Sequence, residues 1–366
     1  MSLPRTPIDA DKLSPAAKKA LGAGPLKMMA ARGLAPLPRP GDLITVLYQL
    51  TLDDDAKIKA AAGKSAAELP DKVLTGALAD ASLDPRVLDY FAPAIAKRQA
   101  LIEIVLLNPA TADVTVADLA GKVGEREVEI IAGNEERLMR HPAIIGAMYM
   151  NRSARMSTVD RAVELAVRNN MKVPGIPAWE EVAKAVLATS TEQRATDANI
   201  DALFAAAVAK AVDPEELEEG EELPLEDIPI SKMSIPMKIR LASLGNAFTR
   251  GELVRDANKM VSMAAIKAPG VSELEAIKYA GNSGLSDEII GYIARQREWT
   301  KLYGCKLALV NNPKTPIAVA IRFVAHLREK DVRALSRSKG VPSAIAAQAR
   351  KLVMVRTSGG SPRGKH

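Results

Sequence analysis

Leu83-Asp84-Pro85-Arg86-Val87-Leu88-Asp89-Tyr90-Phe91-Ala92 is matched 202 residues later by Leu285-Ser286-Asp287-Glu288-Ile289-Ile290-Gly291-Tyr292-Ile293-Ala294. The apolar positions and one tyrosine coincide in the two stretches. After two extra residues in the second copy, Leu107-Asn108-Pro109-Ala110-Thr111 likewise meets Asn311-Asn312-Pro313-Lys314-Thr315. Shared helical periodicity can produce some of this likeness by chance. The near-constant offset favours a duplicated unit, which we therefore predict.

The apolar residues recur with the period of an α-helix. Ile317, Ala320, Ile321, Val324 and Leu327 follow the i, i+3, i+4, i+7 rule that places side chains on one face of a helix. The sequence has no Asn-Gly or Asp-Gly pair between alternating apolar runs, which is the usual signal of a β-hairpin. These patterns predict helices and disfavour sheets.

Helix starts are also predicted from local capping patterns. Ser65 and Ser272 are each followed three residues later by Glu, the spacing of a capping box. Proline follows a polar residue at four places where it fits the first turn of a helix. These places are Asp84-Pro85, Asn108-Pro109, His141-Pro142 and Asn312-Pro313. We expect short helices with frequent caps.

The composition supports the same fold class. Of the 366 residues, 48% are hydrophobic but only 3% are aromatic. Strands favour aromatic and β-branched side chains, whereas Ala, Leu and Met favour helices that pack closely. The composition therefore disfavours an all-β fold. Disorder of the whole chain is excluded, because the apolar content suffices for one or two domains.

The second half resembles a known class of helical repeat. Ala268-Pro269, Asn312-Pro313 and Val341-Pro342 are spaced by 44 and 29 residues, in the range of two-helix repeats. Together with Asn312-Pro313-Lys314-Thr315-Pro316 and the run after it, these residues look like the leucine-rich-variant and HEAT-like repeats of bacteria. The resemblance covers residues 255–352 well and 42–170 weakly. It implies an α-solenoid of stacked helical hairpins used as an interaction surface, with no catalytic residues.

Charge is distributed unevenly along the chain. Residues 294–366 contain 16 Lys and Arg against three Asp and Glu, whereas residues 1–293 contain 34 against 41. Residues 213–227 hold nine acidic side chains and no basic ones, and prolines interrupt them. Like charges and prolines prevent a packed helix, so this stretch predicts an acidic linker. The alternative is an acidic docking strip or a mimic of nucleic acid.

These features predict five parts of the chain. A proline-rich and loosely attached arm at residues 1–40 comes first, and two helical-repeat lobes follow at 41–212 and 230–356. The acidic linker at 213–229 joins the lobes. Residues 357–366, rich in Gly, Ser and basic side chains, form a flexible tail.

The basic end of the second lobe provides the candidate binding residues. Arg295, Arg297, Lys301 and Lys306 are expected in one helical segment, and Lys330, Arg333 and Arg337 on one face of another. A solvated helix face explains such residues without any function; the alternative is a patch that attracts an acidic partner, phosphate or an anionic membrane surface. The candidate residues are Arg295, Arg297, Lys301, Arg322, Lys330, Arg333, Arg337 and Lys339.

Sequence-specific recognition of nucleic acid has less support than binding of a protein partner. The sequence has no zinc finger and no Gly-rich phosphate loop, and Trp299 and Tyr303 are expected to pack together rather than to stack on bases. Helical-repeat proteins can nevertheless bind nucleic acid through a basic face. Binding by residues 294–351 is therefore the alternative function.

Catalysis and metal binding are not expected. Cys305 is the single cysteine and has apolar neighbours, which predicts a buried residue rather than a nucleophile. His141 and His326 lie near no recognisable nucleophile or metal-binding motif, and no P-loop or dinucleotide fingerprint is present. We predict no cofactor and no small-molecule substrate.

The expected function is that of a scaffold. No signal peptide begins the sequence and no apolar run approaches the length of a membrane span, so we expect a cytoplasmic location. We predict a non-catalytic interaction scaffold or adaptor that binds a protein partner, acidic where it meets the second lobe.

Overall fold

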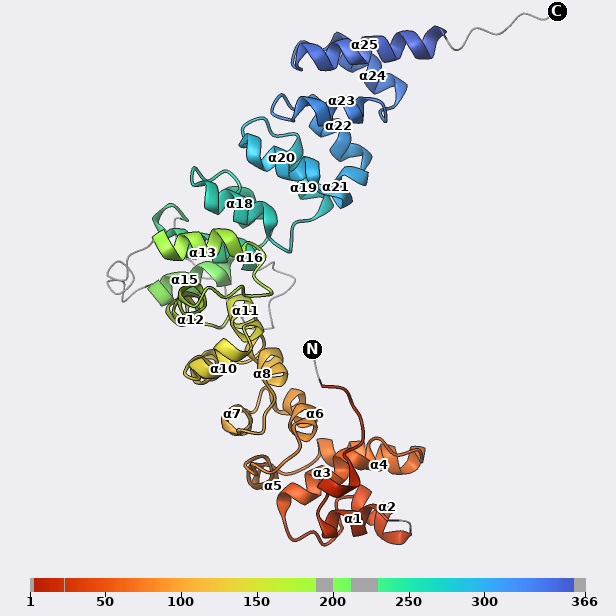
Figure 1. Ribbon diagram of the computed structural model, residues 1–366, viewed down its shortest axis with the longest axis vertical. Helices are drawn as coiled ribbons and strands as arrows, with labels where there is room; N and C mark the ends of the chain where they lie inside the picture. Colours follow the sequence, from red (N-terminus) through yellow and green to blue (C-terminus); the bar gives the residue numbers. More distant parts are fainter. Residues whose placement is uncertain (1–2, 23, 189–199, 212–229, 359–366) are drawn as a thin grey trace, which may run out of the picture. The chain divides into compact units, whose positions relative to one another are not determined.

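The computed structural model describes residues 3–22, 24–188, 200–211 and 230–358 (Figure 1). This part of the chain is built of α-helices and two short 3-10 helices, Ala10–Lys12 and Ile230–Lys232, and holds no strand. The all-α prediction is therefore confirmed. The predicted acidic linker and all but two residues of the predicted tail lie outside the described residues.

The chain divides into two compact units. Unit 1 comprises Met1–Ile176 and Val186–Ala205, and unit 2 comprises Pro177–Ala185 and Ala206–His366. The predicted lobe boundary at residues 213–229 stays a prediction, because those residues are not described.

Unit 1 contains short helices of 6 to 13 residues, several of which begin at a proline. They are α1 (Pro15–Leu21), α2 (Pro25–Ala31), α3 (Pro40–Leu50), α4 (Ala56–Ala67), α5 (Asp71–Leu78), α6 (Pro85–Ile95), α7 (Gln99–Leu107), α8 (Asp113–Ala120), α9 (Glu125–Ala132), α10 (Glu135–Arg140), α11 (Ala143–Met150) and α12 (Met156–Arg168).

Helices α13 (Trp179–Ala188) and α15 (Ile200–Lys210) come next along the chain. The helices of unit 2 that follow are α16 (Ile235–Leu244), α17 (Ala247–Leu253), α18 (Lys259–Lys267), α19 (Glu273–Ala280), α20 (Asp287–Arg295), α21 (Arg297–Lys301), α22 (Tyr303–Asn311), α23 (Ile317–Val324), α24 (Glu329–Arg337) and α25 (Ser343–Ser358).

Each helix packs mainly against helices close to it in the chain. In unit 1, α3 contacts α4 and α5, α5 contacts α7, and α7 contacts α9. In unit 2, α19 contacts α22, α22 contacts α23, and α24 and α23 both contact α25. Within each unit, the buried core therefore follows the chain order of the helices. The predicted apolar stripe supplies part of it, since Ala320, Val324 and Leu327 are buried beside Leu335 and Ile345.

The N-terminal 40 residues are not the loose arm that the composition predicted. Helices α1 and α2 fill much of this region and pack against α3 and α4. Their alanines Ala17 and Ala30 are fully buried. Pro15 and Pro25 occupy the first turns of the helices, where a missing N–H costs nothing, so proline here begins helices instead of extending the chain.

The capping predictions have mixed outcomes. Ser272 and Glu275 form the predicted capping box at the start of α19, and Asp84 caps α6 with Pro85 in its first turn. Ser65 lies inside α4 and starts no helix, so that prediction is wrong. The helix that follows begins at Asp71 after Pro70.

The Asn-Pro pairs are the clearest error. Asn108 and Asn312 end helices α7 and α22, and the next helices begin only at Asp113 and Ile317. His141 likewise ends α10, and the helix that follows Pro142 begins at Ala143. The residue before a proline avoids helical geometry, which favours a helix end at that place.

The two asparagines instead join one segment to the one before it. The buried Asn312 side chain donates from Nδ2 to the carbonyl of Ala280, the last residue of α19, at 2.8 Å, and accepts from the Lys314 N–H at 3.0 Å. Asn108 donates to the carbonyl of Leu78, the last residue of α5, at 2.7 Å. Thr315 and Thr111 each donate to a carbonyl in the helix before them, at 2.5 Å.

A third asparagine makes the same contact without a proline after it. Asn151, at the end of α11, donates to the carbonyl of Ala120, the last residue of α8, at 2.8 Å. It also accepts from the Ser153 N–H at 2.8 Å. The recurring element is thus the buried amide, because it satisfies a helix-end carbonyl that packing has hidden from water.

We expect Asn312→Ala to lower the free energy of unfolding by about 1–3 kcal/mol, because the Ala280 carbonyl and the Lys314 N–H lose their buried partner. Urea unfolding followed by circular dichroism measures the change. Asn311→Ala is the matched control, since the exposed Asn311 side chain bonds only to its own helix. Equal effects of the two substitutions would contradict the role given to Asn312.

Candidate basic interface

All eight predicted basic residues are exposed on unit 2. Arg295 is the last residue of α20, Arg297 and Lys301 bound α21, and Arg322 lies on α23. Lys330, Arg333 and Arg337 lie on α24 opposite the buried Val332 and Leu335, as predicted. Lys339 follows α24.

The first basic segment is broken where a single helix was expected. Gln296 and Leu302 have extended backbone geometry and divide residues 287–311 into α20, α21 and α22. Trp299 and Tyr303 therefore do not share a helix face. Trp299 packs edge-on against Tyr292, with ring centroids 6.1 Å apart, which corrects the predicted Trp299–Tyr303 pair.

Two of the eight cations are paired with carboxylates. Lys301 bonds Glu298 at 2.8 Å, and Arg333 bonds Glu329 one turn away on the same helix. Asp331, the third acidic residue of this region, accepts from the Tyr303 hydroxyl. The other six cations form no ion pair with any residue that the structure describes.

Four of these six occupy matched places at, or just beyond, the C-terminal ends of two helices. Helices α20 and α24 have the same length and each ends on an arginine, Arg295 or Arg337. One residue separates each arginine from a second cation, Arg297 or Lys339. A cation at a helix C-terminus also complements the helix dipole, which explains one residue of each pair but not the second.

One further exposed cation of the same kind was not predicted from the sequence. Lys278 lies in the last turn of α19, and Arg322 lies in the last turn of α23. Both helices have 8 residues. Both side chains are exposed. The signal that could have found Lys278 is its spacing of 44 residues from Arg322, the spacing that separates Ala268-Pro269 from Asn312-Pro313.

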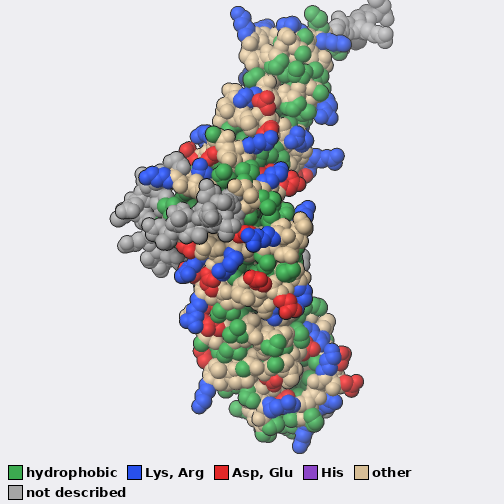
Figure 2. All heavy atoms as spheres, turned by 60° about the vertical axis from the view of Figure 1, so that its left-hand side comes forward, with side chains coloured by type: hydrophobic (Ala, Val, Ile, Leu, Met, Phe, Trp, Pro, Cys, Tyr) green, Lys and Arg blue, Asp and Glu red, His purple; other side chains and the backbone are tan. Residues whose placement is uncertain are grey.

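The cations do not form one continuous patch on the face that Figure 2 shows. There the blue Lys and Arg side chains over the C-terminal helices stand apart, with hydrophobic and uncharged groups between them. An extended ligand that touches several separated charges suits this distribution better than a compact one.

The residues considered for chemistry lie elsewhere. Cys305 is fully buried, as predicted, and its burial raises the pKa of the thiol to about 11. His326 is exposed, and His141 borders an open hollow lined mainly by small apolar groups such as Ala117, Gly121 and Ala147. In the described residues no three His, Cys, Asp or Glu side chains are grouped as ligands of a metal ion.

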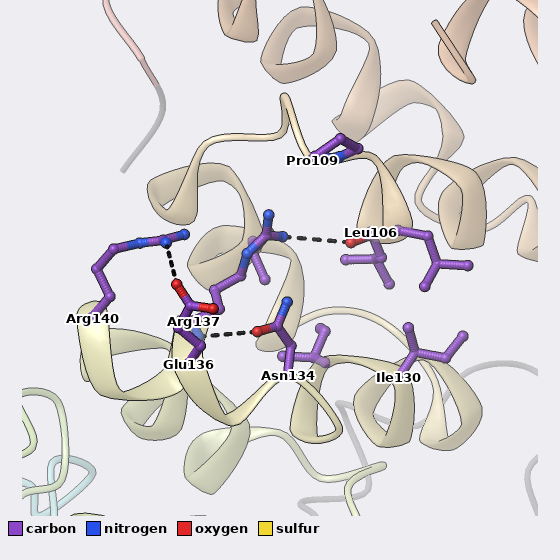
Figure 3. Close-up of a pocket in the computed structure, with 10 residues that line it drawn as sticks. Leu106, Pro109, Ile130, Asn134, Glu136, Arg137 and Arg140 are labelled. Atoms are coloured by element: carbon purple, nitrogen blue, oxygen red, sulfur yellow. Dashed lines mark hydrogen bonds and ion pairs between the residues drawn. The ribbon is translucent and has the colours of Figure 1, made fainter. Parts of the chain in front are cut away.

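A cavity of about 290 Å³ in unit 1 holds two guanidinium groups (Figure 3). Arg140 forms a fork with Asp113 at 2.7 and 2.9 Å, and this hydrogen bond holds the pKa of the Asp113 carboxyl below its usual value. The buried Arg137 donates to the carbonyls of Leu106 and Thr111 at 3.4 and 3.2 Å.

Burial lowers the pKa of the Arg137 guanidinium, while Asp113 at 3.3 Å opposes that shift. Glu136 lies 3.6 Å from Arg140 and completes a balance of two cations and two carboxylates. This balance indicates a joint that fixes α10 on the end of α7. The described lining residues include no histidine, cysteine or hydroxyl group.

Comparison of the chain with protein-family models, with curated proteins and with solved structures finds no match. Among the described helices, none combines the length and the apolar character that a membrane crossing requires.

Proposed function

We propose that this protein is a non-catalytic interaction scaffold, and that unit 2 binds an acidic segment of a protein partner. The observation that carries the proposal is the matched pair of exposed cations at the ends of α20 and α24, none of which has a carboxylate partner among the described residues. Exposed cations without a carboxylate partner attract an acidic chain and speed its association.

The scaffold is an α-solenoid of stacked helical hairpins in two lobes. Two observations support this arrangement: helices pack mainly on near neighbours in the chain, and Asn108, Asn151 and Asn312 make the same contact to the segment before them. In such a fold each repeat adds surface, so a ligand can run along several helices.

Charge reversal at these four positions, in the full-length chain, tests the proposal. A variant with Arg295→Glu, Arg297→Glu, Arg337→Glu and Lys339→Glu is compared with wild type for binding of fluorescein-labelled poly-glutamate at low salt. We expect the affinity to fall by about tenfold or more, since each lost contact removes favourable charge interaction.

The matched control changes net charge equally in unit 1. It carries Lys18→Glu, Lys57→Glu, Lys59→Glu and Lys72→Glu, four exposed cations without an ion pair to the described residues. Its affinity for poly-glutamate should stay within about twofold of wild type. Equal losses in both variants, or no binding by wild type, would overturn the proposed interface.

Duplex DNA in the same assay tests the alternative function. If residues 294–351 bind nucleic acid, the affinity for DNA should exceed that for poly-glutamate and fall steeply as salt rises. The separated cations favour the acidic protein. So do the aromatic rings of the basic region, because Trp299 packs on Tyr292, Arg328 lies over the Tyr303 ring and Phe323 packs against the core.

A further inference from the structure

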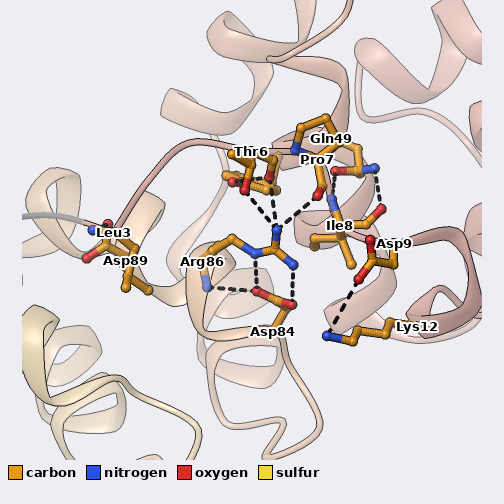
Figure 4. A network of polar contacts seen from close by, with 11 residues as sticks. Leu3, Thr6, Pro7, Ile8, Asp9, Lys12, Gln49, Asp84, Arg86 and Asp89 are labelled. Carbon is orange, nitrogen blue, oxygen red and sulfur yellow. Dashed lines mark hydrogen bonds and ion pairs between the residues drawn. The ribbon is translucent and has the colours of Figure 1, made fainter.

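An extended segment at the N-terminus lies across helices α3 and α6 of unit 1 (Figure 4). We call residues 3–8, Leu3-Pro4-Arg5-Thr6-Pro7-Ile8, the strap. It has no helical structure, and four of its side chains, those of Pro4, Arg5, Thr6 and Pro7, are exposed. Only Ile8 is buried, with 4% of its surface exposed.

Side chains of the two helices bind the main chain of the strap. The Gln49 amide accepts from the Ile8 N–H at 2.8 Å and donates to the Ile8 carbonyl at 3.2 Å. The Tyr48 hydroxyl donates to the Thr6 carbonyl at 2.9 Å, and Arg86 donates to the Pro7 carbonyl at 2.9 Å. Two strap side chains are contacted as well: Arg86 donates to the Thr6 hydroxyl at 3.0 Å, and the Arg5 guanidinium lies 5.3 Å from the centroid of the Tyr90 ring. The main-chain contacts, which are the more numerous, tolerate many sequences.

The fourth contact lies at the other end of the strap. The buried Asp89 carboxylate accepts from the Leu3 N–H at 3.0 Å. Glu129 occupies the corresponding place on α9, and there Thr158 and Arg161 of α12 take both carboxylate oxygens. In Asp89, Thr115 takes one oxygen at 2.6 Å and the second is left for the strap.

The receptor side chains are held in place without the strap. Two bonds of 2.8 Å fix the Arg86 guanidinium on Asp84, which also caps α6. Thr115 fixes Asp89 in the same way. Release of the strap would uncover one aliphatic side chain and would remove one protein partner from each of the Asp89 carboxylate and the Tyr48 hydroxyl, which are both buried while the strap is bound. A site with such groups favours an occupant.

We propose that the surface of α3 and α6 beneath the strap, which we call the groove, binds an extended, proline-containing segment of a partner protein, and that the strap is its competitor within the chain. The partner segment carries an aliphatic residue directly after a proline, as Pro7-Ile8 does, and presents its main chain to Gln49, Tyr48 and Arg86. Proline limits the entropy that such a segment loses on binding. The groove is distinct from the basic interface of unit 2.

The test uses a labelled, acetylated peptide of residues 3–9 and the full chain. In wild type the tethered strap competes at a high effective concentration, so we expect weak binding of the peptide. Ile8→Asp places a charge at the buried anchor and releases the strap. We expect this variant to bind the peptide at least about tenfold more tightly than wild type, by fluorescence anisotropy.

Two controls separate the groove from general effects. Adding Gln49→Ala to the Ile8→Asp chain should weaken peptide binding by about tenfold. Adding Asn169→Ala, which removes an exposed amide that bonds only its own helix, should leave the affinity unchanged. A peptide with Asp in place of Ile8 should not bind.

Three outcomes would overturn the proposal. The first is no peptide binding by an Ile8→Asp chain that keeps its helical circular dichroism. The second is equal binding with and without Gln49→Ala. The third is a wild-type dimer that Ile8→Asp abolishes, which would assign the groove to a second copy of this chain. If Ile8→Asp fails to fold, Leu3→Pro removes the N–H that Asp89 accepts, together with the half-buried Leu3 side chain, and should likewise tighten peptide binding.

Discussion

Replacing Gly146 with alanine is expected to destabilise unit 1 by about 3 kcal/mol or more. Gly146 lies in α11, and a Cβ atom there would stand 2.0 Å from the carbonyl oxygen of Pro174 and 3.2 Å from its carbonyl carbon. Both are backbone atoms, so no side-chain rotation can relieve the clash. The loop that contains Pro174 is itself constrained, since Gly175 has a φ of +85°, which residues with a side chain rarely adopt.

Urea unfolding measures this loss, and amide hydrogen exchange in α11 locates it. Gly63→Ala is the matched control, because nothing lies within 4 Å of a Cβ atom at that place in α4. Alanine has a higher helix propensity than glycine, so the control substitution should raise the free energy of unfolding by about 0.5–1 kcal/mol. A Gly146→Ala protein as stable as the control would show that the two segments do not approach as closely as described.

The second large effect is expected from Arg250→Ala in unit 2. The Arg250 guanidinium donates to both oxygens of Glu275 at 3.0 and 2.9 Å and to the Gly245 carbonyl at 2.6 Å. Both partners of the ion pair are about nine-tenths buried. Removal of the cation leaves a buried carboxylate without its counter-ion, which costs about 3–5 kcal/mol.

This loss should depend on pH. Burial alone would raise the pKa of the Glu275 carboxyl, but hydrogen bonds from Arg250 and Ser272 hold it below its usual value. In wild type the carboxylate therefore contributes stability at neutral pH, which is lost as pH falls through the lowered pKa. In Arg250→Ala burial dominates and the pKa rises, so protonation relieves the variant. Its deficit relative to wild type should shrink from neutral to acidic pH.

Urea unfolding at neutral and at acidic pH measures both the loss of stability in Arg250→Ala and its dependence on pH. Arg255→Ala is the control, because Arg255 is about half exposed and pairs with Glu252 at 3.4 Å one turn away. Such surface pairs contribute about 0–1 kcal/mol, so the control should change stability little at either pH. A deficit of Arg250→Ala that does not vary with pH would contradict the role given to Glu275.

Patterns that depend on neighbouring residues predicted the fold well. The apolar period placed Val324 and Leu327 in the core, and the Ser272 and Asp84 caps begin helices where local hydrogen bonding requires them. The same rules failed at Asn108 and Asn312. There the side chain bonds a helix end some 30 residues earlier in the chain, and no local rule contains that partner.

The candidate sites divide in the same way. The sequence predicted the exposed cations of α24, because the apolar period fixes the opposite face of that helix. It predicted a loose arm where the strap is bound, since the groups that bind it, Gln49 and Arg86, lie 40 to 80 residues further along. Proline content describes the strap alone and carries no information about its receptor.

By itself, then, the sequence determined the helical class, the internal match between residues 83–92 and 285–294 and the basic C-terminal segment, because each follows from composition or from short-range spacing. Only the tertiary structure decided where the buried amides bond, how Arg250 is paired and what holds the strap. These contacts join residues that are distant in the chain, and packing removes their polar groups from water.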